Sequence, residues 1–364
     1  MTEADQQEKK ANCRELIAKW KAIVAEYQKP KFWRSNWQIV NSIGTYAAVW
    51  YLMYLSLSVS WLLTVPLAIL AGGLLIRVFI IFHDCGHGSF FKSRRANDFL
   101  GFITGTLTFT PHHHWWWEHS LHHSTSGHLD RRGVGDVWTL TVGEYLGSSR
   151  WVKLSYRLFR NPFVIFGIGP LFMFLIRERF PVRGAGPRER RSVWIVDLAV
   201  FTLAAGLIAI FGFLPWLIIQ LTIVAVTFPC GVWLFYVQHQ FEDAYWERGE
   251  DWDYTAAAMK GSSFYKLPKV LQWFSGNIGF HHVHHLSPRI PNYNLERCHQ
   301  SDPMLQAVEP MTLLSSLKSI NFRLWDENTG KLVGFRHLKK QHSDRKTEDK
   351  FDEKEETHHL VSRI

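Results

Sequence analysis

Cysteine is scarce in this sequence, and its positions exclude several kinds of cofactor site. The four cysteines, Cys13, Cys85, Cys230 and Cys298, form no C-x-x-C pair. The sequence therefore supports neither a zinc ribbon nor an iron–sulfur cluster, and a disulfide framework is not expected. No haem or flavin motif is evident, and the chain carries no internal repeat or low-complexity tract. These absences leave no built-in electron-transfer group.

The two ends of the sequence carry no targeting signal that we can identify. Residues 1–10 are polar and no apolar segment follows them directly, so a cleaved signal peptide is not expected. The last four residues, 361–364, match no retention or lipidation motif. We therefore expect the first apolar stretch to stay in the protein as an uncleaved anchor.

Charge and aromatic content indicate a membrane surface rather than nucleic acid. The net charge is +9, with 41 Lys and Arg against 32 Asp and Glu, and the chain contains 17 Trp. The basic residues gather in the tails and in a segment between hydrophobic stretches, which is typical of the cytoplasmic side of a membrane protein. Tryptophan is enriched at membrane–water interfaces. We expect contact with membrane lipids and no nucleic-acid partner.

Four apolar stretches are long enough to cross a bilayer, which takes about 20 helical residues. They cover residues 39–58, 62–82, 193–213 and 214–237. Two shorter apolar segments, 99–110 and 163–176, are better explained as interfacial or re-entrant helices. The predicted fold is an all-α integral membrane protein with four transmembrane helices in two hairpins, interfacial or re-entrant helices, and a cytoplasmic helical cap.

The distribution of Lys and Arg predicts the orientation of these helices. The two outer turns contain no Lys or Arg, whereas the segment 83–192 is rich in both. The positive-inside rule places that segment and both termini in the cytoplasm. We divide the chain into a cytoplasmic amphipathic segment (1–38), a membrane domain (39–310) and a charged cytoplasmic tail (311–364). A multi-pass protein of the bacterial inner membrane or the endoplasmic reticulum is expected.

Three histidine clusters carry the chemistry. The clusters are His83 and His87; His119, His122 and His123; and His281, His284 and His285. The first has the spacing i, i+4 and the other two have i, i+3, i+4, which places the imidazoles on one face of a helix. His282 lies about 100° from that face and is not expected to bind. A histidine-rich surface without a metal rarely repeats one spacing three times.

The clusters supply eight imidazoles, which suit two ions because a tetrahedral zinc site uses four ligands or fewer. Imidazole favours iron, copper, zinc or nickel over magnesium or calcium. Counting spans puts all three clusters at the same membrane face. His239, at the end of the fourth span, emerges there too and is either a further ligand or an interfacial capping residue. We predict that the cap carries a histidine-rich dimetal site.

Charged residues near the clusters are candidates to support the ligands, because ligating histidines usually donate their second N–H to a carboxylate or carbonyl. These candidates are Asp84, Asp136, Glu242 and Asp243, although each could equally be a solvated charge. Arg77 and Asp197 lie inside predicted spans, a few residues from the same face. Charges inside a bilayer are costly and usually paired, so we predict that Arg77 and Asp197 form a structural ion pair.

Three stretches resemble the histidine boxes of the membrane fatty acid desaturase family. They are FHDCGHGSFF (82–91), HSLHH (119–123) and GFHHVHHL (279–286). The segments GDVWTLT (135–141) and PRIPNY (288–293) are similar to its acyl-lipid, omega-6 (delta-12)-type branch. The resemblance covers most of the predicted membrane domain. It implies two iron ions, molecular oxygen as co-substrate, and ligand roles for His83, His87, His119, His122, His123, His281, His284 and His285, with His239 as a further ligand.

One position departs from the family pattern. Some members carry an asparagine one helical turn before the histidine that corresponds to His239, and here that position is Phe235. A water ligand held by asparagine is therefore in doubt. Asn277, four residues before His281, is a candidate substitute, although ordinary helix capping would explain it equally well.

The resemblance implies oxidative desaturation of a fatty acyl chain carried by a lipid or a thioester, with O2 reduced to water. Electrons would come from an external ferredoxin or cytochrome b5-type donor, which a basic face would attract. A hydroxylase or related acyl oxygenase on the same scaffold is an alternative that product analysis would separate. A histidine-rich metal transporter fits less well, because transporters place their ligands near the bilayer midplane.

Overall fold

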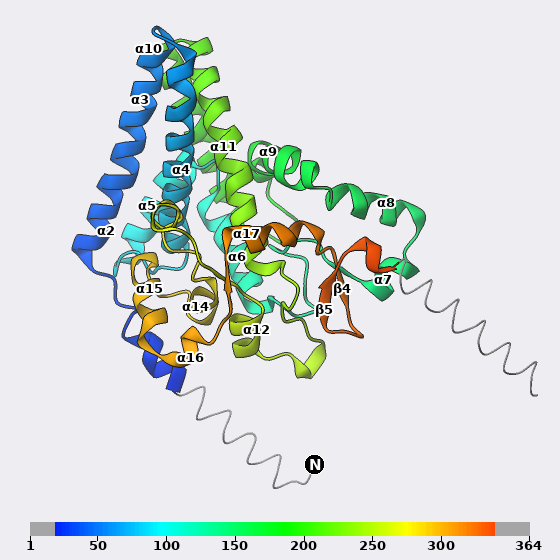
Figure 1. Ribbon diagram of the computed structural model, residues 1–364. Helices are drawn as coiled ribbons and strands as arrows, with labels where there is room; N and C mark the ends of the chain where they lie inside the picture. Colours follow the sequence, from blue (N-terminus) through cyan, green and yellow to red (C-terminus); the bar gives the residue numbers. More distant parts are fainter. Residues whose placement is uncertain (1–18, 339–364) are drawn as a thin grey trace, which may run out of the picture.

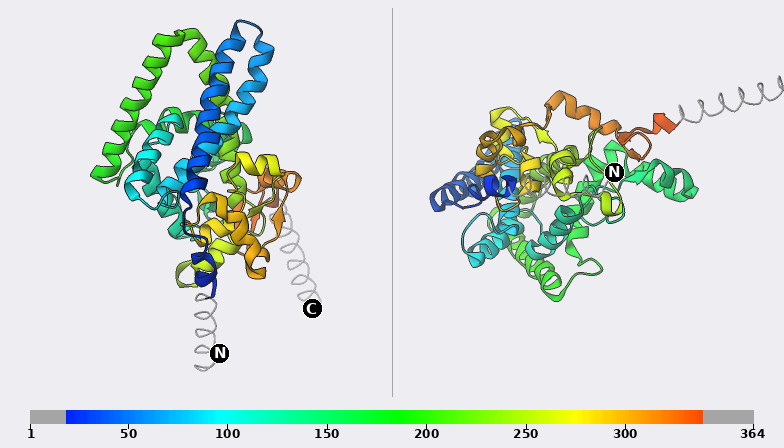
Figure 2. Two further views of the ribbon diagram at one scale, coloured as in Figure 1. Left: turned by 90° about the vertical axis from the view of Figure 1, so that its left-hand side faces the viewer. Right: turned by 90° about the horizontal axis from the view of Figure 1, so that it is seen from below.

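The computed structural model describes residues 19–338, which form a predominantly helical protein. Four helices rise together from a cap of shorter elements (Figure 1): α3 (Thr45–Leu57), α4 (Trp61–Gly86), α10 (Pro187–Phe211) and α11 (Phe213–His239). They form two hairpins, α3–α4 and α10–α11, whose turns lie at the end far from the cap (Figure 2). The predicted helical membrane fold is confirmed.

Three of these helices are long and apolar enough to cross a membrane, namely α4, α10 and α11. They correspond to the predicted spans 62–82, 193–213 and 214–237. Each extends beyond its predicted bounds at the cap end, most clearly α4, which continues to Gly86, and α10, which begins at Pro187. The extra turns are polar, so hydropathy alone ended the predicted spans too early.

The first predicted span, 39–58, is part of a composite helix. α2 (Phe32–Ile39) passes through a π-helical turn, η1 (Val40–Gly44), into α3, which has 13 residues. α3 alone is shorter than the about 20 residues that a full crossing takes, so a fourth span stays a prediction. The boundary that we drew after residue 38 falls inside this continuous helical run.

Close contact between α4 and α11 depends on Gly72. A Cβ atom at Gly72 would lie 2.7 Å from Val226 Cγ1, closer than side chains pack. The hydroxyl of Thr227 donates a hydrogen bond to the Gly72 carbonyl oxygen at 3.3 Å. Small residues of this kind allow two helix backbones to approach in a membrane protein.

We expect the substitution Gly72→Leu to lower the midpoint of thermal unfolding by about 2–10 °C, because overpacking typically costs about 1–3 kcal/mol. The matched control is Gly206→Leu on α10, where a Cβ atom would meet nothing within 4 Å. Tryptophan fluorescence of the detergent-solubilised protein during heating measures both midpoints. Equal midpoints for the two variants would contradict the close α4–α11 contact.

A bent helical arm projects sideways from beside α11 (Figure 1). It consists of α8 (Arg150–Phe159), η2 (Val164–Ile168), α9 (Gly169–Leu175) and η3 (Arg177–Arg179). The two halves of the arm meet at 59° and together pass the length and apolarity test for one broken span or re-entrant loop. This geometry agrees with the interfacial or re-entrant helix predicted at 163–176. The other short apolar segment lies largely in α5 (Arg94–Leu107), which packs against α4 and α10.

The cap consists of short helices and a few residues of β-structure. Its remaining helices are α6 (His112–Thr125), α7 (Val142–Gly147), η4 (Gly249–Asp251), α12 (Tyr254–Lys260), α13 (Lys269–Phe274), α14 (His281–Leu286), α15 (Asn292–Ser301), α16 (Pro303–Gln306), α17 (Leu313–Ser316) and η5 (Leu317–Asn321). Two small sheets, ordered β1-β4-β5 and β2-β3, join segments far apart in the sequence. Their strands are β1 (Leu140–Thr141), β2 (Phe264–Tyr265), β3 (Pro310–Met311), β4 (Leu324–Asp326) and β5 (Lys331–Val333).

The segment that we predicted as a charged tail from residue 311 is folded onto the cap as far as residue 338. β4 pairs in parallel with β1 and antiparallel with β5. Leu324, Trp325 and Leu332 are buried against apolar residues from other parts of the cap. The rest of the predicted tail, 339–364, and residues 1–18 of the predicted N-terminal segment lie outside the described residues.

Candidate metal centre

The first histidine cluster lies at the cap end of α4. His83 occupies the last turn of the helix and His87 is its C-cap. One helical turn separates them, so their rings lie 4.7 Å apart and face the same space. The buried position of His83 follows from its place on the core face of a membrane-length helix.

The second cluster lies on α6, which crosses beneath the bundle. His119, His122 and His123 are all buried. Trp115, one turn earlier, stacks on the His119 ring at 4.3 Å between centroids and fixes the plane of that imidazole. The helical periodicity therefore brings three imidazoles to the interior, as predicted.

The third cluster forms the short helix α14, whose six residues are all buried. His281, His284 and His285 face inward, whereas the His282 Nε2 atom lies 3.0 Å from the Leu305 carbonyl oxygen and 3.1 Å from His299 Nδ1. The structure thus directs His282 away from the other three imidazoles, in the direction that the helical period predicts.

The clusters meet as two groups of imidazoles whose ligand atoms all lie within 4.8 Å of one another in each group. One group is His83, His87, His119, His123 and His284, and the other is His122, His239, His281 and His285. All three predicted clusters and His239 are therefore brought together. Each group draws on at least three separate segments of the chain.

The spacing of the ring nitrogens fits ligand shells. The Nε2 atoms of His83 and His119, of His119 and His123, and of His123 and His284 are 3.0–3.1 Å apart. In the other group, His239 Nε2 lies 3.1 Å from His122 Nε2 and 3.0 Å from His281 Nε2. Two nitrogens at right angles around one ion, each about 2.1 Å from it, are about 3.0 Å apart. Both groups therefore have the donor type and the spacing that suit a metal ion.

Two further nitrogens support the same fit. The Nε2 atoms of His87 and His285 are buried and have no hydrogen-bond partner. A buried polar atom without a partner costs about 1–3 kcal/mol. Coordination of one ion by each group would satisfy both atoms.

Burial keeps most of these imidazoles in the neutral form that binds metals. Burial, reinforced by neighbouring histidines, lowers the pKa values of His119, His123, His284 and His285 well below the ordinary histidine value. A neutral imidazole has a free lone pair on one nitrogen. No proton has to leave these rings near neutral pH before a cation binds.

Several second ring nitrogens are oriented by oxygen atoms. His122 Nδ1 donates to Asp136 Oδ1 at 2.6 Å, and His239 Nδ1 donates to the Gly261 carbonyl oxygen at 3.2 Å. His83 Nδ1 lies 3.3 Å from Asp84 Oδ1. These contacts leave the Nε2 atoms to face the interior of the groups, as metal-binding histidines usually require.

Asn292 supports the first cluster, a role that was not expected from the sequence. Its backbone N–H and its side-chain amide donate to Asp84 Oδ2 at 2.7 and 2.8 Å. Asn292 belongs to the quoted segment PRIPNY, so the motif indicated its neighbourhood but not its role. The Gly261 carbonyl oxygen was also missed, and a backbone atom leaves no signal in a sequence.

Three of the predicted supporting residues serve elsewhere. Glu242 and Asp243 are exposed and lie 3.5 and 3.0 Å from Lys331 Nζ. The Asn277 amide donates to the Asn292 carbonyl oxygen at 3.2 Å and accepts from Gln272. The prediction that Glu242 or Asn277 supports the metal groups is therefore wrong, because both side chains are committed to other partners.

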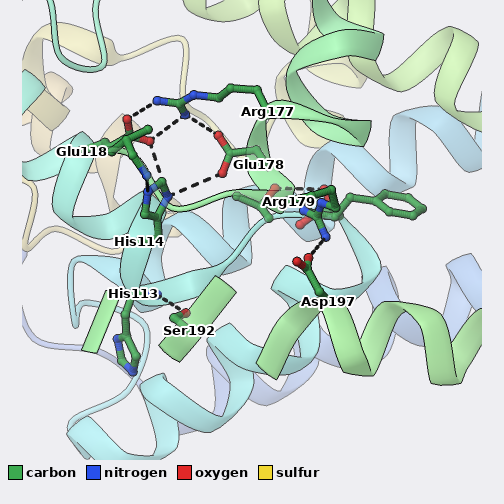
Figure 3. Close-up of polar contacts among 12 residues, drawn as sticks. His113, His114, Glu118, Arg177, Glu178, Arg179, Ser192 and Asp197 are labelled. Atoms are coloured by element: carbon green, nitrogen blue, oxygen red, sulfur yellow. Dashed lines mark hydrogen bonds and ion pairs between the residues drawn. The ribbon is translucent and has the colours of Figure 1, made fainter. Parts of the chain in front are cut away.

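The predicted ion pair between Arg77 and Asp197 is also wrong. Arg77 Nε donates to Ser42 Oγ at 3.1 Å, and its guanidinium lies over the Trp273 ring, 4.1 Å from the centroid. Asp197 instead accepts from Arg179 at 2.5 Å, as Figure 3 shows. Both intramembrane charges are paired or stacked, as expected, but not with each other.

A buried ionic network anchors the helix of the second cluster (Figure 3). Glu118, next to His119 on α6, accepts two hydrogen bonds from Arg177, which also donates to Glu178 at 2.5 Å. His114 Nε2 accepts from the Val182 backbone N–H at 3.2 Å. A metal on His114 Nδ1 would require a proton on Nε2, opposite that donor, so this acidic cluster is better suited to holding α6 against the arm than to binding a cation.

Comparison with known proteins places this geometry in a family. The sequence model of the family described as fatty acid desaturase matches residues 59–311. The chain is 52% identical over 316 residues to a fatty acid desaturase of Bacillus subtilis (strain 168), covering 87% of this chain and 90% of that protein. It is 28% identical over 289 residues to the sn-1 oleoyl-lipid 12-desaturase of Synechocystis sp., covering 76% and 77%. It is 27% identical over 294 residues to the sn-1 acyl-lipid omega-3 desaturase (ferredoxin) of the same organism, with the same coverage. The chain therefore belongs to the fatty acid desaturase family of membrane oxidoreductases.

Proposed function

We propose that this chain introduces a double bond into the acyl chain of a membrane lipid, using two iron ions bound by its nine convergent imidazoles and O2 as co-substrate. The observation that carries the proposal is the division of these imidazoles into two adjacent groups with ligand-like spacing. We assign one ion to each group.

With this assignment, the two ions have different numbers of histidine ligands. His83, His87, His119, His123 and His284 supply five nitrogens, whereas His122, His239, His281 and His285 supply four. Phe235 packs against the four-histidine group, with its ring 5.3 Å from His122 and 5.4 Å from His239. An apolar ring at this position supports the expectation that no asparagine-held water completes the group.

The residues of this chain hold and orient the metal and keep water away from it. Asp136 and the Gly261 carbonyl take the Nδ1 protons of His122 and His239, which fixes the tautomer and aims both Nε2 atoms inward. Trp115 fixes the ring plane of His119 by stacking on it. Bound iron would supply the redox chemistry by which one O2, two external electrons and two protons convert a saturated –CH2–CH2– unit into –CH=CH– with release of two water molecules.

The substrate and donor follow from the relatives' names and from the surface charge. The two Synechocystis relatives are an oleoyl-lipid and an acyl-lipid desaturase, and one is named with ferredoxin. An acyl lipid, rather than an acyl thioester, is accordingly our preferred substrate. Because the chain carries no C-x-x-C pair, we expect a ferredoxin or cytochrome b5-type protein to deliver the electrons.

The orientation in the membrane rests on charge asymmetry. The hairpin turns at Ser58–Ser60 and Gly212 carry no Lys or Arg, whereas the cap end carries many. The positive-inside rule supports a multi-pass arrangement with the metal centre and both termini in the cytoplasm.

Fatty-acid profiling tests the proposal. The full chain would be expressed in a host with simple saturated and monounsaturated lipids, together with a ferredoxin and its reductase. Gas chromatography with mass spectrometry should reveal a new double bond that is absent from cells carrying the variant His122→Ala. A hydroxylated product would instead identify a hydroxylase, and an unchanged profile with iron-loaded protein would contradict the proposed activity.

A further inference from the structure

A large cavity opens on the cap beside the first histidine cluster. Its volume is about 780 Å³, within the range of about 300–1,000 Å³ that is usual for small-molecule sites. Its wall comes from the end of α4, the start of α5, the start of α6, the first turn of α10 and three further segments, within 25–30, 88–92 and at residue 289. His87, a member of the five-histidine group, is one of the lining residues.

The lining of this cavity is strongly basic. Its cations are Lys29, Lys92, Arg94, Arg188 and Arg289, and Asp98 is its one carboxylate. All five cations are exposed. Arg188 lies 3.5 Å from Asp98 and 3.3 Å from His113 Nε2. Among residues 19–338, no carboxylate lies within 4.0 Å of the other four cations. Their mutual repulsion is therefore not offset by an acidic partner in this part of the chain.

The backbone adds to this positive potential. Lys92 and Arg94 flank Ser93, the N-cap of the 14-residue helix α5. The N-terminus of a helix carries a partial positive charge and favours anions, above all phosphate groups. The side-chain cations and the start of α5 therefore both favour an anion in this cavity.

From these features we propose that the cavity binds the phosphate group of the acyl substrate's headgroup and so selects phospholipid substrates. This inference rests on the proposed function and narrows its substrate class. The exposed cations would hold the phosphate, and His87, which lines the same cavity, connects the cavity to the five-histidine group. A phosphate-free glycolipid would lack the group that the cations bind.

The shape of the site favours a headgroup over an acidic electron-donor protein. A folded donor can cover a basic surface but cannot enter a cavity of about 780 Å³ that reaches a buried ligand group. The phosphate groups of coenzyme A could bind the same cations, so coenzyme A is included as a separate probe.

Binding to the purified, iron-loaded full chain tests the proposal directly. Isothermal titration calorimetry would use dihexanoylphosphatidylglycerol, coenzyme A and inorganic phosphate as separate probes. The test variant is Arg94→Gln with Arg289→Gln. The control is Arg95→Gln with Arg297→Gln, which makes the same change in charge at exposed positions that do not line the cavity. We expect the lipid to bind at least about tenfold more weakly to the test variant and with unchanged affinity to the control. The reason is that hydrogen bonds between charged groups contribute strongly to binding.

The outcomes separate this inference from the proposed function. Coenzyme A binding more tightly than the lipid, with loss only in the test variant, would overturn the selection of phospholipids and identify a thioester substrate. Equal weakening in both variants, or no binding of any probe, would overturn the site even if desaturation is observed. In the reconstituted reaction, the test variant should raise KM for phosphatidylglycerol about tenfold at unchanged kcat and leave KM for digalactosyldiacylglycerol unchanged. If the test variant changed only the concentration of electron donor needed for half-maximal rate, the phosphate site would also be overturned.

Discussion

Replacing His239 with alanine is expected to remove one of the two proposed iron ions and to abolish desaturation. His239 Nε2 lies between His122 Nε2 and His281 Nε2, at 3.1 and 3.0 Å. It is one of four imidazoles in its group, so its loss leaves three, whereas the five-histidine group is untouched. We expect activity to fall by more than about 100-fold, beyond the 10–100-fold loss that follows removal of an outer partner of a ligand. Iron per chain, measured by mass spectrometry of the purified protein, should fall by half.

The control for this variant is His128→Asn. His128 Nδ1 accepts a hydrogen bond from the Asp130 backbone N–H at 3.2 Å, and an asparagine oxygen can occupy the same place. This variant should keep its iron and its activity, since His128 belongs to neither group. If His239→Ala retained both iron ions and full activity, His239 would be the interfacial capping residue that the sequence left open.

The sequence predicted the inward-facing histidines because helical periodicity is a local property. The i, i+3, i+4 spacing determines which imidazoles share a face before any tertiary contact is known. Hydropathy located α4, α10 and α11 in the same way. His282 was excluded by the helical period, and the structure directs it toward Leu305 and His299.

The division of the histidines into two groups could not be predicted. His122 and His123 are adjacent on α6, yet His123 belongs to the five-histidine group and His122 to the other. Adjacent residues on a helix point about 100° apart. His122 therefore faces His239 on α11, whereas His123 faces His284 on α14. Only the packing of those helices around α6 decides which ring joins which group.

The failed pairing of Arg77 with Asp197 has a related cause. Counting residues from the membrane face gives the depth of a charge along its helix but not the side of the bundle that it faces. Arg77 faces η1 and α13, where it meets Ser42 and Trp273. Asp197 faces η3, which supplies Arg179. η3 lies in the bent arm, and no sequence pattern indicates that this arm lies beside α10.

Replacing Asp136 with asparagine is expected to loosen the iron of the four-histidine group by about 10–100-fold, the loss that is usual for an outer partner of a ligating histidine. Asp136 Oδ1 accepts the Nδ1 proton of His122 at 2.6 Å, and Oδ2 accepts from the Gly133 backbone N–H at 3.2 Å. Asparagine can keep one of these hydrogen bonds but not the negative charge that makes His122 a stronger donor to the metal. Iron release into a competing chelator should therefore be faster for half of the bound iron, and kcat should fall with it.

Asp243→Asn is the matched control for this substitution, because it removes one carboxylate from an exposed site. Asp243 lies 3.0 Å from Lys331 Nζ, and such exposed pairs contribute about 0–1 kcal/mol. If the control released iron as fast as Asp136→Asn, the effect would come from the overall charge of the cap. If neither variant released iron faster, the carboxylate of Asp136 would only shape its loop through Gly133. Faster release from Asp136→Asn alone would mean that the charge acts through the His122 ring, because that hydrogen bond is the shortest contact of the carboxylate.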